Sequence, residues 1–342
     1  MDKLKDDEEI DYYQPFAEIS KTTVLHGCKK FNELKYVKNR WDEVCHLLTQ
    51  LLYLLAQGER FNSSEATEIF FGVTQLFQSK NQTMRRLMYL FIKEVAEATA
   101  AEEVIIVTSS LQKDMVSTND LLKANSLRVL CKILDSSMLA QVDRSIKPLI
   151  VDRNPMVSSA ALVSGHLLFA ENQDIVRRWI SEVQEAMKSD NSMVQYHALA
   201  LLYKLRGHDR LAVTKLVSGL WKKQLRSPMA LCQLIRYTTR IMQQTNVSEA
   251  VARSAYAFLE TCVHNRDDMV IFEAARAIIN LPDVRPEDLQ PAVTQLQLFL
   301  SSGKPVLRFA AVRSISKVAM MHPEVVTRCN DDMESMISDS NR

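Results

Sequence analysis

The chain has 342 residues, of which 47% are hydrophobic, and a formal net charge of +1. That length and apolar content suffice to bury a large core, and only 7 Gly and 9 Pro favour a helix-rich folded chain. The near-zero charge argues against duplex nucleic acid as the main partner, because phosphate binding usually needs a concentrated basic surface.

The first segment, residues 1–14, is polar and mostly acidic, and we expect it to form a disordered tail. Its charges exclude an ordinary signal peptide, and no apolar run in the chain approaches membrane-spanning length. Residues 15–342 are predicted to form one trunk.

Within the trunk one pattern recurs eight times: an apolar residue near the start of a helical stretch is followed four residues later by a small or apolar residue. These anchors are Val44, Met84, Leu122, Val157, Val194, Leu231, Val270 and Leu307. Their spacing of roughly 35 to 40 residues is typical of HEAT or armadillo repeats. The sequence therefore predicts an all-α fold, an α-solenoid of stacked antiparallel helix pairs.

Each anchor is expected in the second helix of a pair, and polar residues such as Asn154 and Asn191 should cap those helices. The small residue after the anchor would let a neighbouring helix come close. First helices are predicted over 64–77, 101–113 and 174–187 from their three- and four-residue apolar spacing. Residues 338–342 would supply the turn of one more second helix, so we expect the trunk to be truncated in mid-repeat.

Motifs for common enzyme chemistry are absent from the sequence, including GxGxxG, GxxxxGK[ST], HExxH and GxSxG. His197 is interpreted as a structural histidine, because no nucleophile or carboxylate converges on it. His46 and His264 lie close in sequence to Cys45 and Cys262, but such neighbours on a helix point in different directions. We predict no enzyme activity, no cofactor and no metal.

Several residue types are expected to fill space between repeats. The six cysteines have no metal-finger spacing and are interpreted as reduced and mostly buried. Methionines at the starts of second helices and the three tryptophans are interpreted as packing residues. They are Met84, Met88, Met156, Met193, Met229 and Met269, with Trp41, Trp179 and Trp221.

Particular strings go beyond this repeat pattern, and they cover the chain from about Phe16 onward. They are QLLYLLAQGE (50–59), SEATE (64–68), LFQS (76–79), VIIVTSSL (104–111), MVQYHAL (193–199), DRLAV (209–213), AIINLP (277–282), QLQLF (295–299) and RFAAVR (308–313). In these strings the sequence resembles the gamma-subunit family of the COPI coatomer, which is related to the large subunits of clathrin adaptors.

The resemblance implies a scaffold subunit of the COPI vesicle coat. Its trunk would hold the coatomer zeta subunit in a concave surface, bind an ADP-ribosylation factor GTPase in its GTP state, and contact other coatomer subunits. The chain would then be cytoplasmic and peripheral on Golgi and vesicle membranes through its partners. A phosphatase regulatory subunit and a nuclear-transport receptor remain open as alternatives, since both can use the same kind of solenoid.

The resemblance also places the GTPase on the first helices of two early repeats. The expected contact residues are Phe71, Thr74, Gln75, Ile105, Thr108 and Gln112. Residues three or four apart share a helix face, so each set should form one stripe, with apolar residues for the switch regions and Thr and Gln at the rim. The alternative is that Phe71 and Ile105 are ordinary core residues.

Overall fold

The computed structural model describes residues 16, 19–96, 101–134, 136–223, 225–244, 247–282 and 284–338, without the side chains of 101–105 and 136–137. Within these ranges the chain forms helices, and no strand occurs there. The all-α prediction is confirmed for the described residues. The expected tail, 1–14, lies outside them.

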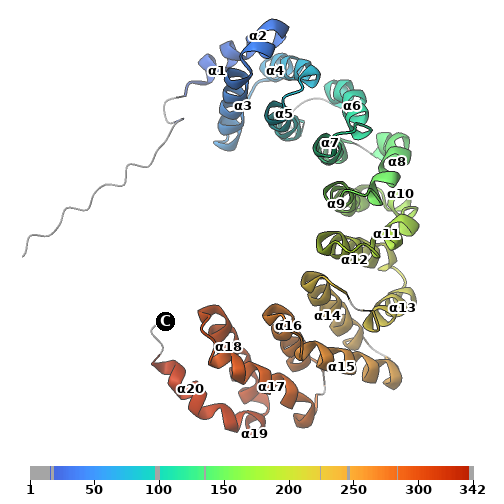
Figure 1. Cartoon of the computed structure of the whole chain (residues 1–342), viewed down its shortest axis with the longest axis vertical. Helices are drawn as coiled ribbons and strands as arrows, with labels where there is room; N and C mark the ends of the chain where they lie inside the picture. The colour runs from blue at the N-terminus through green and yellow to red at the C-terminus, as the bar shows by residue number, and fades with distance from the viewer. Residues whose placement is uncertain are drawn as a thin grey trace, which may run out of the picture. The chain divides into compact units, whose positions relative to one another are not determined.

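The chain divides into two compact units, Met1–Ile146 and Lys147–Arg342. The prediction of a single trunk over 15–342 therefore stays a prediction. In the first unit α3, α5 and α7 pack in a row, and α4 and α6 lie in the other layer (Figure 1). The elements are α1 (Lys21–Cys28), η1 (Lys29–Asn32), α2 (Leu34–Asn39), α3 (Trp41–Ala56), α4 (Ser63–Gln75), η2 (Leu76–Gln78), α5 (Gln82–Val95), α6 (Ala101–Met115), α7 (Asp120–Ile133) and α8 (Ser136–Ile150), which contains the boundary.

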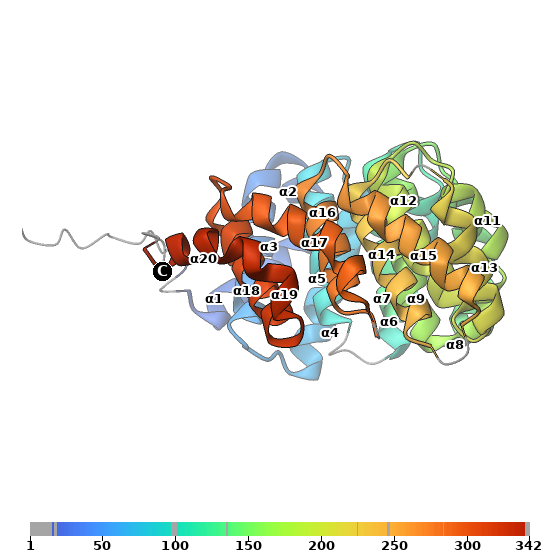
Figure 2. The ribbon, with the colours of Figure 1, turned by 90° about the horizontal axis from the view of Figure 1, so that it is seen from below.

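In the second unit α9, α12, α14 and α16 pack successively, and α13, α15 and α17 form the neighbouring layer (Figure 1; Figure 2 shows the helices from below). The elements are α9 (Pro155–Glu171), α10 (Gln173–Arg177), α11 (Ile180–Ala186), α12 (Ser192–Arg206), α13 (Arg210–Trp221), α14 (Pro228–Met242), α15 (Glu249–Val263), α16 (Asp268–Ile279), α17 (Pro286–Leu300), α18 (Pro305–Met321), α19 (Pro323–Val326), η3 (Thr327–Cys329) and α20 (Asn330–Ile337).

The eight anchors all lie near the starts of second helices, as predicted. The residue four positions after each anchor has no exposed surface. These residues are Leu48, Met88, Ser126, Ala161, Ala198, Ile235, Ala274 and Ala311. Because several of them are Ala or Ser, neighbouring second helices can approach closely there, which is the packing the repeat pattern predicts.

Polar caps fix where the helices begin. Asn62 and Glu65 form a capping box at α4: the Asn62 side chain accepts from the Glu65 backbone N–H at 2.8 Å, and Glu65 accepts from the Asn62 N–H at 2.9 Å. Asn154 and Asn191 cap α9 and α12, as expected from the sequence. Each cap satisfies a backbone donor that the first helical turn leaves free.

The single helix predicted over 174–187 is wrong, because the segment breaks at Arg178 and Trp179 into α10 and α11. Their N–H groups donate three residues back, to Ile175 at 3.1 Å and Val176 at 3.0 Å, which tightens the turn. The Trp179 side chain is fully buried. It packs where a Cβ on Gly165 would lie 3.1 Å from the indole carbon Cζ3. The break thus lets the indole fill the space that this glycine leaves.

The other packing predictions are confirmed only in part. Trp221 lies between helices, donating from its indole N–H to Thr238 Oγ1 at 2.9 Å and stacking on Phe258. Trp41 is 47% exposed and is not a wedge. Met84 and Met88 are fully buried, whereas three methionines at second-helix starts are exposed. Those three are Met193, Met229 and Met269.

Candidate functional site

The residues considered for catalysis or metal binding do not form such a site in the described part of the chain. No group of three His, Cys, Asp or Glu side chains there could hold a metal ion. His197 packs against the Tyr196 ring at 5.1 Å, and burial lowers its pKa. Asp190 pairs with Arg226 at 2.8 Å. His197 therefore serves the packing of α12, as its sequence context suggested.

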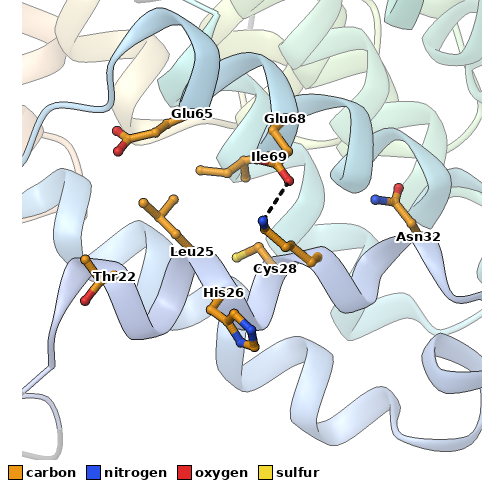
Figure 3. A pocket seen from close by; sticks show the side chains of 9 residues that line it. Thr22, Leu25, His26, Cys28, Asn32, Glu65, Glu68 and Ile69 are labelled. Carbon is orange, nitrogen blue, oxygen red and sulfur yellow. Dashed lines mark ion pairs between the residues drawn. The ribbon is translucent and has the colours of Figure 1, made fainter.

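A small pocket of about 260 Å³ lies between α1, η1 and α4 and is lined by Cys28, Glu68 and their neighbours (Figure 3). Burial, with a smaller contribution from the Glu68 charge, raises the pKa of the Cys28 thiol to about 12. A thiol that stays protonated at neutral pH is a poor nucleophile. Lys29 approaches Glu68 at 3.7 Å, and both side chains are more than half exposed. The pocket therefore offers no activated thiol.

The α4 residues expected to contact the GTPase lie on the surface. Phe71 is 42% exposed, Gln75 is exposed and Thr74 is half-buried. The Thr74 hydroxyl donates to the Phe71 carbonyl at 2.6 Å, so it is held against the last turn of the helix. Because 42% of the Phe71 surface is exposed, the alternative that Phe71 is an ordinary core residue is wrong. The α4 stripe presents one large apolar side chain flanked by polar ones.

The α6 stripe differs from the expectation. Thr108 is buried, with 8% of its surface exposed, because it shares a face with Leu111 and Met115, which pack into the core. Thr108 therefore cannot supply a hydrogen bond at the rim of an interface, and this part of the predicted stripe is corrected. Gln112 is half-buried, and the side chain of Ile105 lies outside the described residues.

One position along, α6 does expose side chains of the expected kinds. Ile106 is 46% exposed, and Ser109 is exposed three residues later. The expected stripe was thus placed one residue out of register on α6. The sequence contained a usable signal, because the buried positions 107, 111 and 115 recur every four residues and leave 106 and 109 on the opposite face.

The side chain of Arg85 in α5 joins the ends of α4 and α6. It donates through Nη1 to the carbonyl of Phe77, just after α4, at 2.8 Å, and through Nη2 to the carboxylate of Asp114 in α6. Tyr89 donates to the same carboxylate at 2.8 Å. Burial raises the pKa of Asp114, against the opposing effects of Tyr89 and Arg85. This cluster holds the carboxyl ends of the two helices together.

Beside the α4 stripe lies a second hollow that the sequence interpretation did not include. It has a volume of about 530 Å³ and is lined by Gln75 together with Leu34 and Trp41. Leu34 is 52% exposed and Trp41 is 47% exposed. Trp41 is the first residue of α3, where a side chain leans back beyond the helix end instead of onto a preceding turn. Its position at the helix start was the missed signal.

The α4 stripe and the neighbouring hollow thus form a surface of helix ends with exposed apolar side chains. Comparison with known proteins assigns the chain to a family. Residues 21–342 match the family model for the adaptin N terminal region. The chain belongs to the adaptin N-terminal family. This result agrees with the resemblance found in the residue strings.

Curated proteins similar to this chain include gamma subunits of coatomer. The chain is 52% identical over 343 residues to coatomer subunit gamma-2 of Oryza sativa subsp. japonica, covering 99% of this chain and 38% of the relative. It is 53% identical to coatomer subunit gamma of Arabidopsis thaliana and 49% identical to coatomer subunit gamma-2 of Homo sapiens, with the same coverage. The chain thus spans 38% of the length of these relatives.

Structural comparison supports the fold alone. A homology model of the full-length AP-3 complex matches with a TM-score of 0.71 at 16% identity, covering 87% of this chain and 52% of that chain. The karyopherin Kap121p, in a complex with the C-terminus of the phosphatase Cdc14p, matches with a TM-score of 0.57 at 13% identity, covering 94% and 36%. Both likenesses agree with the predicted α-solenoid.

None of the described helices combines the length and the apolar character needed to cross a membrane.

Proposed function

We propose that the chain is a trunk segment of a gamma-type coatomer subunit and acts as a scaffold of the COPI vesicle coat. The observation that carries this proposal is about 50% identity to coatomer gamma subunits over nearly the whole chain, for example 52% over 343 residues. The likeness to a karyopherin at 13% identity supports no specific function, because unrelated functions share this fold. Through its partners the chain would work in the cytoplasm on Golgi and vesicle membranes.

The GTPase surface is proposed on the α4 stripe of Phe71, Thr74 and Gln75, with Gln112 of α6. On α6 the proposed contact residues also include the exposed Ile106 and Ser109, in place of the buried Thr108. Ile105 stays in the proposed set on the basis of the sequence alone. An ADP-ribosylation factor in its GTP state has ordered switch regions, whose apolar side chains could pack on Phe71. Exposed apolar anchors surrounded by polar groups are typical of interface centres.

The zeta subunit is proposed to contact the exposed face of the second helices. In α9, Val163 and Leu167 lie four residues apart and are 36% and 56% exposed, and Phe309 of α18 is 68% exposed. Large apolar side chains on a helix face are expected where a permanent partner covers them.

The chain should therefore be more soluble when it is co-expressed with zeta, and Leu167→Asp should weaken that complex. Equally monodisperse material without zeta would count against this assignment.

Catalysis is not part of the proposed function. Any GTP turnover in the complex would belong to the GTPase, because the sequence has no phosphate-binding loop and the buried Cys28 thiol is unreactive. Hydrolysis by the purified chain alone, abolished by a point mutation within it, would defeat this proposal.

Affinity capture from cytosol with the full chain as bait tests the proposal as a whole. Coatomer subunits, including zeta, should co-purify, and a GTP-locked ADP-ribosylation factor should be retained in preference to its GDP form. Capture of a phosphatase catalytic subunit or of the Ran GTPase, without coatomer subunits, would support the rival scaffolds and overturn the coat function.

A further inference from the structure

The second unit contains a groove of about 1360 Å³ between α13 and α15, and none of the helices assigned to the GTPase surface contributes to its lining. Trp221 and Phe258 stack with ring centroids 6.3 Å apart and contribute apolar surface to the lining. Both side chains are only half-buried, so part of each ring faces the groove. The volume exceeds the range of about 300 to 1,000 Å³ typical of small-molecule sites, which indicates a larger occupant.

The charged side chains of the groove all have one sign. Lys215, Lys222, Lys223 and Arg266 line it, and no acidic residue does so in the part of the chain that the structure describes. None of the four has an ion-pair partner among those residues, although cations elsewhere in this unit are paired, as Lys304 is with Asp268 at 2.6 Å. Three of the four follow the carboxyl ends of α13 and α15. The groove therefore combines an apolar lining with positive charge that no carboxylate of the described residues pairs with.

The walls of the groove suit an elongated partner. Small side chains line α15 at positions 250, 254, 257 and 261, a stretch of roughly 16 Å at the rise of an α-helix. On α13, Gly219 faces open space, since a Cβ built there meets no atom within 4 Å. A groove of this length can hold about three turns of helix laid along it.

We propose that this groove binds an acidic amphipathic helix of a partner protein. Apolar side chains of that helix would pack on Trp221 and Phe258. Its carboxylates would pair with Lys222, Lys223 and Arg266, with Lys215 engaged nearer the other end. The pairing would supply the negative charge that the groove itself lacks and would fix the direction in which the helix lies.

The test measures binding of a synthetic fluorescent peptide of about 14 residues to the full chain by anisotropy. The peptide carries Leu along one helical face and Glu along the other, and a matched peptide has Lys in place of Glu. Gly219→Leu adds a large side chain at a groove-lining position where an added Cβ meets no atom within 4 Å, and Leu is a better helix former than Gly. Its control is Gly303→Leu, where an added Cβ also meets open space.

A second variant pair tests the charge. Lys222→Glu with Lys223→Glu reverses two groove cations, and Lys35→Glu with Lys38→Glu makes the same charge change on exposed residues of α2. Vesicles of phosphatidylcholine with phosphatidylserine are tested alongside the peptides, because a membrane surface also presents negative charge.

We expect the acidic peptide to bind and to lose at least tenfold in affinity with Gly219→Leu and with the groove charge reversal, while both controls stay within twofold. Unchanged binding in Gly219→Leu would overturn the proposal, as would equal binding of the Lys peptide. Vesicle binding that depends on Gly219, without peptide binding, would overturn it in favour of a lipid site.

Discussion

Phe71 and Trp179 are aromatic residues in the first segments of two repeats, and the structure uses them in opposite ways. Phe71 lies on the unbroken helix α4 and is 42% exposed, whereas Trp179 lies at the break between α10 and α11 and is fully buried. Both segments were predicted as similar helices from their apolar spacing. The difference is set by the opposing helix, because α9 offers Gly165 as a space that the indole fills.

A helix break inside a repeat can thus serve to place a large side chain in the core. Turning Trp179 inward places a large apolar side chain in the core, where it contributes stability but cannot contact a partner. Leaving Phe71 outside costs stability and keeps an apolar side chain available for binding. We therefore expect substitution of Trp179 to lower stability and substitution of Phe71 to weaken partner binding.

The largest effect should come from Trp179→Ala, which removes a fully buried aromatic side chain and leaves a cavity. We expect it to lower the free energy of unfolding by about 3 to 5 kcal/mol. Phe71→Ala should change it by less than about 1 kcal/mol, since surface substitutions are usually mild. Urea denaturation of the full chain followed by circular dichroism measures both. Equal losses in the two variants would show that exposure does not distinguish these aromatics.

A somewhat smaller effect is expected at the cluster that joins the ends of α4 and α6. Asp114→Ala leaves the Arg85 guanidinium buried without its carboxylate and should cost about 3 kcal/mol. Asp114→Asn should cost less, because its amide oxygen can still accept hydrogen bonds from Arg85 and Tyr89, although the guanidinium loses its counter-charge.

Thermal denaturation measures the Asp114 variants, with Asp174→Ala as the control. Asp174 is also acidic, but its side chain is 93% exposed, so its loss should be close to neutral. Equal destabilisation by Asp114→Asn and Asp114→Ala would contradict the role assigned to the hydrogen bonds that Asp114 accepts from Arg85 and Tyr89.

The smallest effect is expected in the second unit, where Glu273 of α16 accepts from Arg236 at 2.7 Å and from Arg276 at 2.9 Å. Burial opposes ionisation of Glu273, but the two guanidinium groups outweigh it and lower its pKa. Glu273→Gln should cost about 1 kcal/mol at pH 7, because both arginines are largely exposed.

The pH dependence of this pair has a definite sign. A lowered pKa contributes stability above the unfolded value and loses it as the pH falls through the folded value. The difference between the wild-type chain and Glu273→Gln should therefore shrink below about pH 4. Denaturant titrations at several pH values measure it, with the exposed Glu249→Gln as control. A difference that grows on acidification would contradict the lowered pKa.

Much of the fold could be predicted from the sequence because repeats impose the same packing requirement again and again. The residue four after each anchor is buried in all eight cases, and helix starts follow the Asn caps. The break at Trp179 could not be predicted, since it depends on Gly165, which lies in a different helix. Local spacing describes one helix face but not the surface that faces it.

The candidate site was predictable to the level of the helices and not of each side chain. Phe71, Thr74 and Gln75 were placed on an accessible face, but Thr108 is buried. On α6 the apolar residues 104–107 form a continuous run, so the sequence does not show which of them face the core. Trp41 was missed because its exposure follows from its place at a helix start.

The proposed binding of the GTPase to the exposed α4 stripe is tested most directly by one binding measurement. Titration calorimetry with a GTP-locked ADP-ribosylation factor compares the full chain with the double variant Phe71→Ala and Thr74→Asp. The matched control is Leu298→Ala with Thr294→Asp, which alters an exposed Leu and Thr four residues apart on α17. We predict at least a tenfold loss of affinity in the α4 variant, unchanged zeta binding and thermal stability, and no loss in the control. Unchanged affinity for the GTPase in the folded α4 variant would contradict the claim.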